Sequence, residues 1–197
     1  MRLLNIITFA AATVAAPFPL PDGFPNPNYT QLLNIEKLAG GFLPNSRLPT
    51  SLSKNATTAL KLLAHNEIFE VAFFNELLIN ITTDVPGYRL NDTAPLDRAQ
   101  LVKNIVAIKN QEELHAIAAN TFLVSAGEQP IAPCEYDFPV TNFKNAILFA
   151  QVFTDLALGT IPTIQLLFSR EAGAAATQCP HPRRHSWPGR PTGRLFP

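Results

Sequence analysis

Apolar residues recur at steps of three and four along residues 51–80, a stretch without Pro or Gly. This spacing is typical of the core-facing stripe of an amphipathic helix, here about 25 residues long, and Ser51 or Ser53 is placed to cap its start. The stripe consists of Leu60, Leu63, Glu67, Glu70, Phe74 and Leu77. Two glutamates therefore stand in the middle of an apolar face, where a carboxylate needs a partner, a proton or a metal ion.

A second helix is predicted over residues 97–125, ending at Gly127. Its stripe consists of Leu101, Ile105, Ile108, Glu112, His115, Ala119 and Phe122. Glu112 and His115 take core positions near the middle of this helix. The connection between the two helices is of modest length, which favours an antiparallel pair whose middles meet. We therefore expect Glu67 and Glu70 to lie close to Glu112 and His115.

A third helix is predicted over residues 142–170, where Gly159 and Pro162 are expected to kink it or end it early. Asp155 is its only ionisable residue between Lys144 and Arg170. The surrounding residues are so uniformly apolar that the spacing leaves open whether Asp155 faces inward.

The remaining chain divides into a leader, a signal segment and a tail. Residues 17–50 are rich in Pro, Asn and Gly around one short helical stretch, YTQLLNIEKLAG, and are expected to pack over the main domain as a loop-rich leader. Residues 172–197 bring five prolines and four arginines after Cys179, which predicts an atypical, disordered tail. The helical domain itself is assigned to residues 51–171.

The first sixteen residues combine an early Arg2, an apolar run and a series of small residues up to Ala16. This pattern predicts a secretory signal peptide over residues 1–16 and a protein secreted to the extracellular space or the cell wall. The run is too short to span a bilayer, and no later segment has about 20 uninterrupted apolar residues, so no transmembrane segment is expected.

Secretion makes the Asn-x-Thr triplets usable as glycosylation sites. The four triplets begin at Asn28, Asn55, Asn80 and Asn91. Asn28 and Asn91 fall in predicted loops, and the other two lie near helix ends. Two cysteines, Cys134 and Cys179, are able to pair in an oxidising compartment, and the sequence leaves that pairing open.

Composition narrows the functional classes. The chain has 197 residues, 47% of them hydrophobic, and its 15 basic and 15 acidic residues cancel. The apolar content suits one globular domain of ordinary size, and the zero net charge argues against a nucleic-acid-binding protein.

The chemistry-bearing pattern is Glu112-x-x-His115, which places a carboxylate and an imidazole on one face of a helix. Glu-x-x-His is half of the ligand set of a carboxylate-bridged di-metal site, which uses the motif twice with two further glutamates. No second Glu-x-x-His occurs in the chain. The alternative is a buried hydrogen-bonded cluster of Glu70, Glu112 and a protonated His115 that fixes helix register without metal. The sequence leaves both interpretations open.

Four longer stretches carry a family resemblance: LNIEKLAGGFLPN, ALKLLAHNEIFEVAFFNELLINITTDVPGY, QEELHAIAANTFLVSAGEQPIAPCEYDFPV and FTDLALGTI. They resemble the secreted fungal ferritin-like-domain proteins of the stress-response and late sexual development group. The resemblance implies an all-α, ferritin-like four-helix bundle whose fourth helix is missing here or replaced by the tail.

The same resemblance implies a ligand set and a range of functions. It assigns Glu67 or Glu70 to the first helix and Glu112 with His115 to the second, and leaves only Asp155 on the third, with iron or manganese as the expected metal. The implied function is a secreted glycoprotein with a stress or developmental role and no catalysis. The alternative is a metal-dependent oxidase or related enzyme that acts on an unidentified small molecule. An apolar groove left by a missing fourth helix favours self-association.

Overall fold

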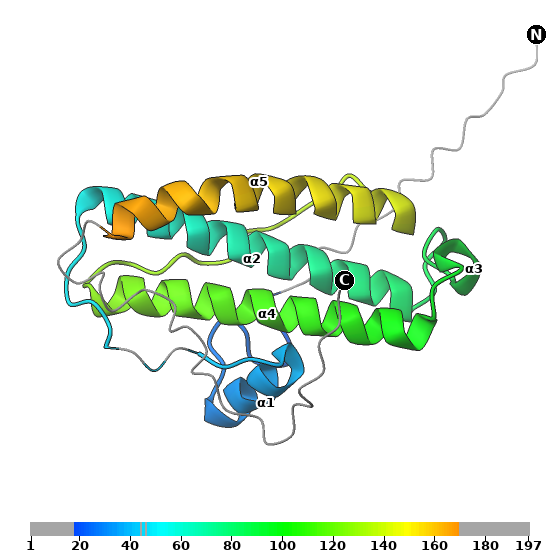
Figure 1. Ribbon diagram of the computed structural model, residues 1–197. Coiled ribbons are helices and arrows are strands. Elements are labelled where there is room, and N and C mark those ends of the chain that lie inside the picture. Colours follow the sequence, from blue (N-terminus) through cyan, green and yellow to red (C-terminus); the bar gives the residue numbers. More distant parts are fainter. Residues whose placement is uncertain (1–17, 44, 46, 170–197) are drawn as a thin grey trace, which may run out of the picture.

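The computed structural model describes residues 18–43, 45 and 47–169, and this part of the chain is all helical, as predicted. The predicted signal peptide, the predicted tail and Cys179 lie outside the described residues. The helices are α1 (Tyr29–Ala39), α2 (Lys54–Thr82), α3 (Leu90–Thr93), α4 (Arg98–Ser125) and α5 (Phe143–Ser169). Figure 1 shows α2, α4 and α5 as three long, nearly parallel rods, with α1 packed below α4.

Side-chain caps begin the first two long helices. The hydroxyl of Ser53 accepts a hydrogen bond from the backbone N–H of Ala56 at the start of α2, and the carboxylate of Asp97 accepts one from Gln100 at the start of α4. Each cap satisfies a backbone donor that the first helical turn leaves unpaired. The predicted starts of both helices are therefore confirmed to within a residue or two.

Helices α2 and α4 run antiparallel and pack against each other along their length (Figure 1). Their shared core includes the fully buried Ala64 and Leu123, which lie near the end of the pair where α2 begins. The leader covers the same pair from outside, because Leu20 and Phe24 pack with Ile68 of α2 and with Ala116 of α4. The expectation that the leader lies over the main domain is confirmed.

Helix α5 packs on α2 through aromatic rings. Phe69 and Phe73 of α2 meet Phe149 and Phe153 of α5 with ring centroids 5.0 to 6.4 Å apart. The helix runs from Phe143 to Ser169, which confirms the predicted range of residues 142–170, and of the two effects expected at Gly159 and Pro162 the early end does not occur. Pro162 has no N–H to donate to the carbonyl of Leu158, so this one helical hydrogen bond is absent, and Leu158 is an exposed residue.

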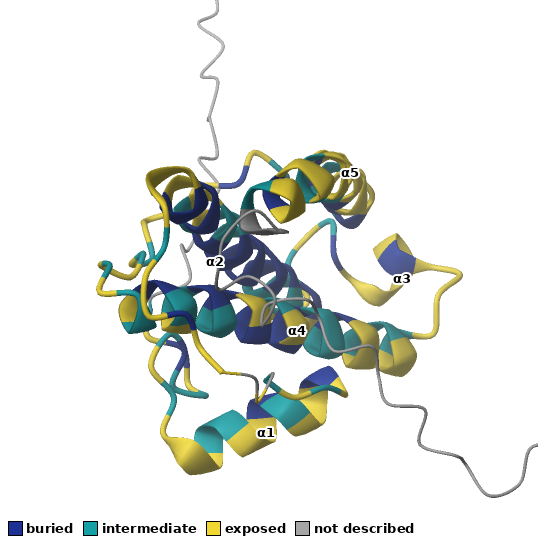
Figure 2. Cartoon of the chain, turned by 60° about the vertical axis from the view of Figure 1, so that its left-hand side comes forward, coloured by how far each residue is buried: buried dark blue, intermediate teal, exposed yellow. Residues whose placement is uncertain are grey.

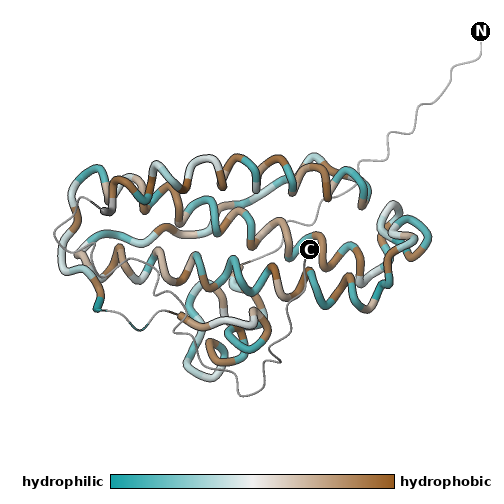
Figure 3. The backbone as a smooth tube through the Cα atoms, in the orientation of Figure 1, coloured by the Kyte–Doolittle hydropathy of each residue, from teal (hydrophilic) through white to brown (hydrophobic). Residues whose placement is uncertain are grey.

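The outer face of α5 is apolar and exposed. In Figure 2 most of this helix is exposed, whereas α2 is largely buried, and Figure 3 shows apolar residues spread along α5. By length and apolarity, Phe143–Leu167 would also suffice to cross a membrane, although the sequence was expected to contain no transmembrane segment, and unlike the core helix of a bundle this stretch is mostly exposed. The large exposed apolar residues on it are Ile147, Leu148, Val152, Leu156, Leu158 and Leu166.

Candidate metal centre

Three of the five predicted ligands lie together between α2 and α4. The ligand atoms of Glu67, Glu112 and His115 all lie within 4.8 Å of one another. His115 Nδ1 lies 2.7 Å from Glu112 Oε2, one helical turn away on α4, and 3.4 Å from Glu67 Oε2 across the helix pair. The prediction that the antiparallel pair brings α2 glutamates to the Glu-x-x-His motif is therefore confirmed for Glu67.

The group is buried on one side and open on the other. Glu67 is only 7% exposed, but the His115 side chain is 60% exposed. The sequence placed His115 on the core face of its helix, and this placement is wrong. The face of α4 that meets α2 is centred on Ala116, Ala119 and Leu123, so His115 falls at its edge.

A proton on His115 provides the electrostatic attraction between the three side chains. Hydrogen bonds to Glu112 and then to Glu67 raise the pKa of His115 to about 10, against the opposing effect of partial burial. Burial raises the pKa of Glu67, and the hydrogen bond from His115 works in the opposite direction. At neutral pH the imidazolium therefore carries the positive charge that the two carboxylates need.

Glu70 lies one turn further along α2 and stands apart from the three-residue group. It is 6% exposed, and its Oε1 accepts a hydrogen bond of 2.8 Å from Asn66 Nδ2. Burial, followed by the negative charge of Glu112, raises its pKa to about 7. Glu70 is thus a nearby carboxyl group that holds its proton easily.

The structure does not bring Asp155 to this group. It is exposed on α5, where its Oδ1 accepts a 2.7 Å hydrogen bond from Gln151 of the same helix. Helix α5 lies against α2 through its aromatic side, which directs Asp155 to the surface instead of toward α4.

The donor set fits one transition-metal ion. Two carboxylate oxygens and one imidazole nitrogen are ligands that iron, manganese and zinc accept, and three protein donors leave coordination positions open. A metal ion would replace the His115 proton as the positive charge of the group, because a coordinating imidazole nitrogen must be deprotonated.

The sequence analysis missed another buried charged group, formed by Asp22, Lys109 and Glu113. Lys109 is 5% exposed and Glu113 is fully buried. The i,i+4 spacing of Lys109 and Glu113 is a signal that the sequence contains. It is also the spacing of ordinary surface pairs, so it did not predict burial.

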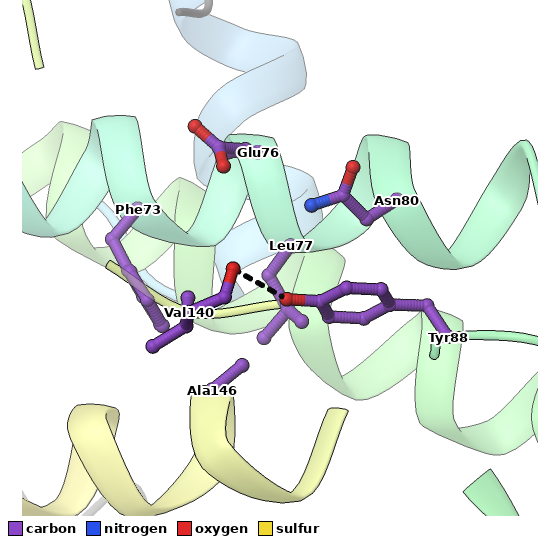
Figure 4. Close-up of a pocket in the computed structure, with 7 residues that line it drawn as sticks. All are labelled: Phe73, Glu76, Leu77, Asn80, Tyr88, Val140 and Ala146. Atoms are coloured by element: carbon purple, nitrogen blue, oxygen red, sulfur yellow. Dashed lines mark hydrogen bonds between the residues drawn. The ribbon is translucent and has the colours of Figure 1, made fainter. Parts of the chain in front are cut away.

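The predicted glycosylation residues differ in exposure. Asn28, Asn55 and Asn91 are exposed, whereas Asn80 is half-buried. Asn80 lines a hollow of about 160 Å³ beside Glu76 and Tyr88, whose hydroxyl donates to the Val140 carbonyl (Figure 4). The hollow has no interior space for even a water-sized molecule, so it is not a ligand pocket. Cys134 is exposed, and its pairing with Cys179 stays an open question.

Comparison with known protein families gives a match over more than half of the chain. The profile of the family described as "Ferritin-like domain" matches residues 53–177, which include α2, α4 and α5. No curated protein matches the chain. No solved structure matches it.

Proposed function

Because the chain belongs to the ferritin-like domain family, we propose that it is a secreted glycoprotein that holds one metal ion between α2 and α4 and has no catalytic activity. The observation that carries this proposal is the half-complete ligand group, with Glu67 on one helix and Glu112 and His115 on the other. The resemblance of the sequence to stress-response and sexual development proteins supports a stress or developmental role.

The ligand count favours binding over catalysis. A di-metal centre of this fold takes a Glu from each of two helices and a Glu-x-x-His from each of two others. The group described here offers one of each. Within the described part of α5, the only carboxylate is Asp155, which is exposed. Three donors in an open geometry suit a single ion of modest affinity.

Metal binding of the purified protein tests this proposal. We expect iron(II) or manganese(II) to bind at no more than one ion per chain, and His115→Ala to weaken binding at least tenfold. His65→Ala, which changes an exposed histidine of α2 outside the group, is the matched control. Equal metal binding by wild type and His115→Ala would exclude this site.

An oxidase acting on a small molecule is the second candidate function, and Glu70 is the observation that favours it. Its carboxyl group has a pKa of about 7 and interacts with the charge of Glu112, so it is suited to accept or release a proton beside a bound ion. An iron or manganese ion held there would supply redox chemistry. Dioxygen consumption by metal-loaded protein with small reductants, abolished in Glu70→Gln, would favour the enzyme. No consumption above free metal would favour the binding protein.

Secretion and glycosylation form a separate part of the proposal. The signal-like N-terminus supports export to the extracellular space or the cell wall, and three of the four Asn-x-Thr asparagines are exposed. Removal of N-linked sugars from exported protein should lower its mass. We expect loss of this mass change when Asn28, Asn55 and Asn91 are all replaced by Gln, whereas export of an unglycosylated chain would contradict the proposal.

We further propose that a second copy of the chain covers the apolar face of α5. Six large apolar side chains are exposed along this helix, a pattern that marks an interaction surface. The sequence after Cys179 predicts no regular helix that would cover the face from within the same chain. Sedimentation should show a dimer that Val152→Glu with Leu156→Glu dissociates and that Lys103→Glu, at an exposed position of α4, leaves intact. A wild-type monomer at all concentrations would contradict this proposal.

A further inference from the structure

The leader is joined to α4 by a buried contact between three charged side chains. Lys109 Nζ lies 2.5 Å from Asp22 Oδ2 in the leader and 2.6 Å from Glu113 Oε1 one turn along α4. The side chains of Lys109 and Glu113 are 7% and 0% exposed, and that of Asp22 is 19% exposed. One amine therefore contacts two carboxyl groups in a site largely closed to water.

The backbone around Asp22 fixes the direction of its carboxyl group. The backbone N–H groups of Gly23 and Leu20 donate to the carbonyls of Leu20 and Phe24, respectively, which closes a tight turn. Gly23 has φ +90°, a conformation that L side chains rarely adopt. Asp22 Oδ1 accepts from the N–H of Phe24 at 3.3 Å, which leaves Oδ2 directed at the lysine.

Apolar side chains seal the turn against the bundle. Leu20 and Phe24 are 4% and 0% exposed and pack on Ile68, Val71 and Ala116. Glu113 Oε2 has no hydrogen-bond partner among the described residues, and this carboxyl group contacts Lys109 and also lies beside the carboxyl group of Asp22. A carboxyl group with a free oxygen beside an amine is placed to move protons between nitrogen and oxygen.

We propose that Lys109 and Asp22 condense to an intramolecular amide bond, with Glu113 as the proton relay. Glu113 takes a proton from the Lys109 ammonium group, and the freed Nζ attacks Cγ of Asp22. The Cγ–Oδ2 bond then breaks as Glu113 returns that proton to the departing oxygen. A second proton passes from nitrogen to the same oxygen, which leaves as water.

The step balances without an oxidant, a reductant or a second reactant. An ammonium group and a carboxylate become one amide and one water molecule, and Glu113 ends in its starting state. Condensation of a free amine and a free carboxylate is unfavourable in water, but contact geometry in a site closed to solvent supplies a high effective concentration. The product ties residue 22 to residue 109 covalently, and this inference does not depend on metal binding.

Mass spectrometry of the purified full-length chain tests the bond directly. After removal of any N-linked sugars, the denatured chain should be lighter than its sequence mass by one water molecule. Trypsin should release a branched peptide in which the N-terminal fragment ending at Lys37 is joined to residues 104–144, because an amidated Lys109 is not cleaved. An unreduced mass and a linear peptide of residues 104–109 would overturn the proposal.

Three variants separate the roles of the residues. Lys109→Arg keeps the positive charge and Asp22→Ala removes the acceptor in the partly exposed leader, so both should show the full mass while circular dichroism reports a helical fold. Glu113→Gln should fold and form at least tenfold less amide, and normal amide formation in this variant would overturn the relay. In the wild-type digest, the Lys61–Glu128 ion pair is the matched control. Its atoms are 2.8 Å apart but both side chains are over a third exposed, and it should show no loss of water.

Discussion

Helix α4 carries two charged groups on neighbouring faces, and they differ in what covers them. Glu112 and His115 meet Glu67 at an edge open to solvent, whereas Lys109 and Glu113 meet Asp22 under the leader. In the open group the positive charge is a proton on an exposed imidazole, which a metal ion from solution is able to replace. In the covered group it is a lysine of the same helix, which cannot leave.

The two groups also show how burial acts on similar carboxyl groups. Burial raises the pKa of Glu113 to about 7 even though Lys109 opposes the shift. Glu112 lies at the rim, where its hydrogen bond to His115 is the main cause of the imidazole's raised pKa. The difference indicates that the covered group contributes to holding the leader on the bundle, and that the open group is the one available for binding.

The largest effect is expected when the covered group loses its cation. Lys109→Ala removes the amine, and with it the amide that we propose, and leaves two carboxyl groups facing each other without a positive charge, which costs about 3–5 kcal/mol of unfolding free energy. Urea denaturation at neutral pH measures it. Lys103→Ala, an exposed lysine of the same helix, should change stability by about 0.5 kcal/mol or less. Equal effects of the two substitutions would contradict the role assigned to Lys109.

The second-largest loss of stability is expected when the packing of the leader over Lys109 is weakened. Phe24 is fully buried in the leader, so Phe24→Ala should cost about 3 kcal/mol through lost burial and a residual cavity. It should also admit water to the Lys109 site. In a Lys109→Arg background, which keeps the positive charge and cannot form the proposed amide, salt should then affect stability more with Phe24→Ala than without it, because exposed ion pairs are screened and buried ones are screened much less. An unchanged salt dependence would mean that Phe24 does not seal the group.

The open group should contribute little to stability. His115→Ala is expected to change the unfolding free energy by about 1 kcal/mol or less, since the imidazole side chain is 60% exposed and water screens it, although its partners Glu67 and Glu112 are only 10% and 15% exposed. Urea denaturation and metal titration of His115→Ala, measured side by side, test whether this residue matters for metal binding more than for stability. A loss as large as that of Lys109→Ala would remove the contrast between the groups.

Glu76 extends the comparison, because it is a buried carboxyl group that forms no ion pair with a lysine or a histidine among the described residues. It is 8% exposed, its Oε2 has no hydrogen-bond partner among the described residues, and burial, followed by the charge of Asp137, raises its pKa. The folded state therefore binds this proton more tightly than the unfolded state, so stability is highest at acidic pH and falls as pH rises through the raised pKa. Glu76→Gln should remove that part of the fall, a shift of about 1–3 °C in the thermal midpoint at neutral pH. Parallel pH profiles of variant and wild type would contradict the assignment.

The local pattern of the sequence predicted the helices and half of the site. The stripes of period 3.6, the cap at Ser51 or Ser53 and the prolines of the leader depend on interactions within a few residues, so the sequence alone indicates them. The meeting of Glu67 with Glu112 and His115 was also predictable, because a short connection makes neighbouring helices antiparallel and opposes their middles.

Only the tertiary structure decided which charged residues are buried. The stripe placed His115 in the core, but the packing of α4 on α2 leaves it at the edge. Lys109 and Glu113 read as a surface pair, and they are buried because residues 20–24, far away in sequence, fold over them. Burial depends on the surfaces that distant segments bring together, and the spacing within one helix does not contain that information.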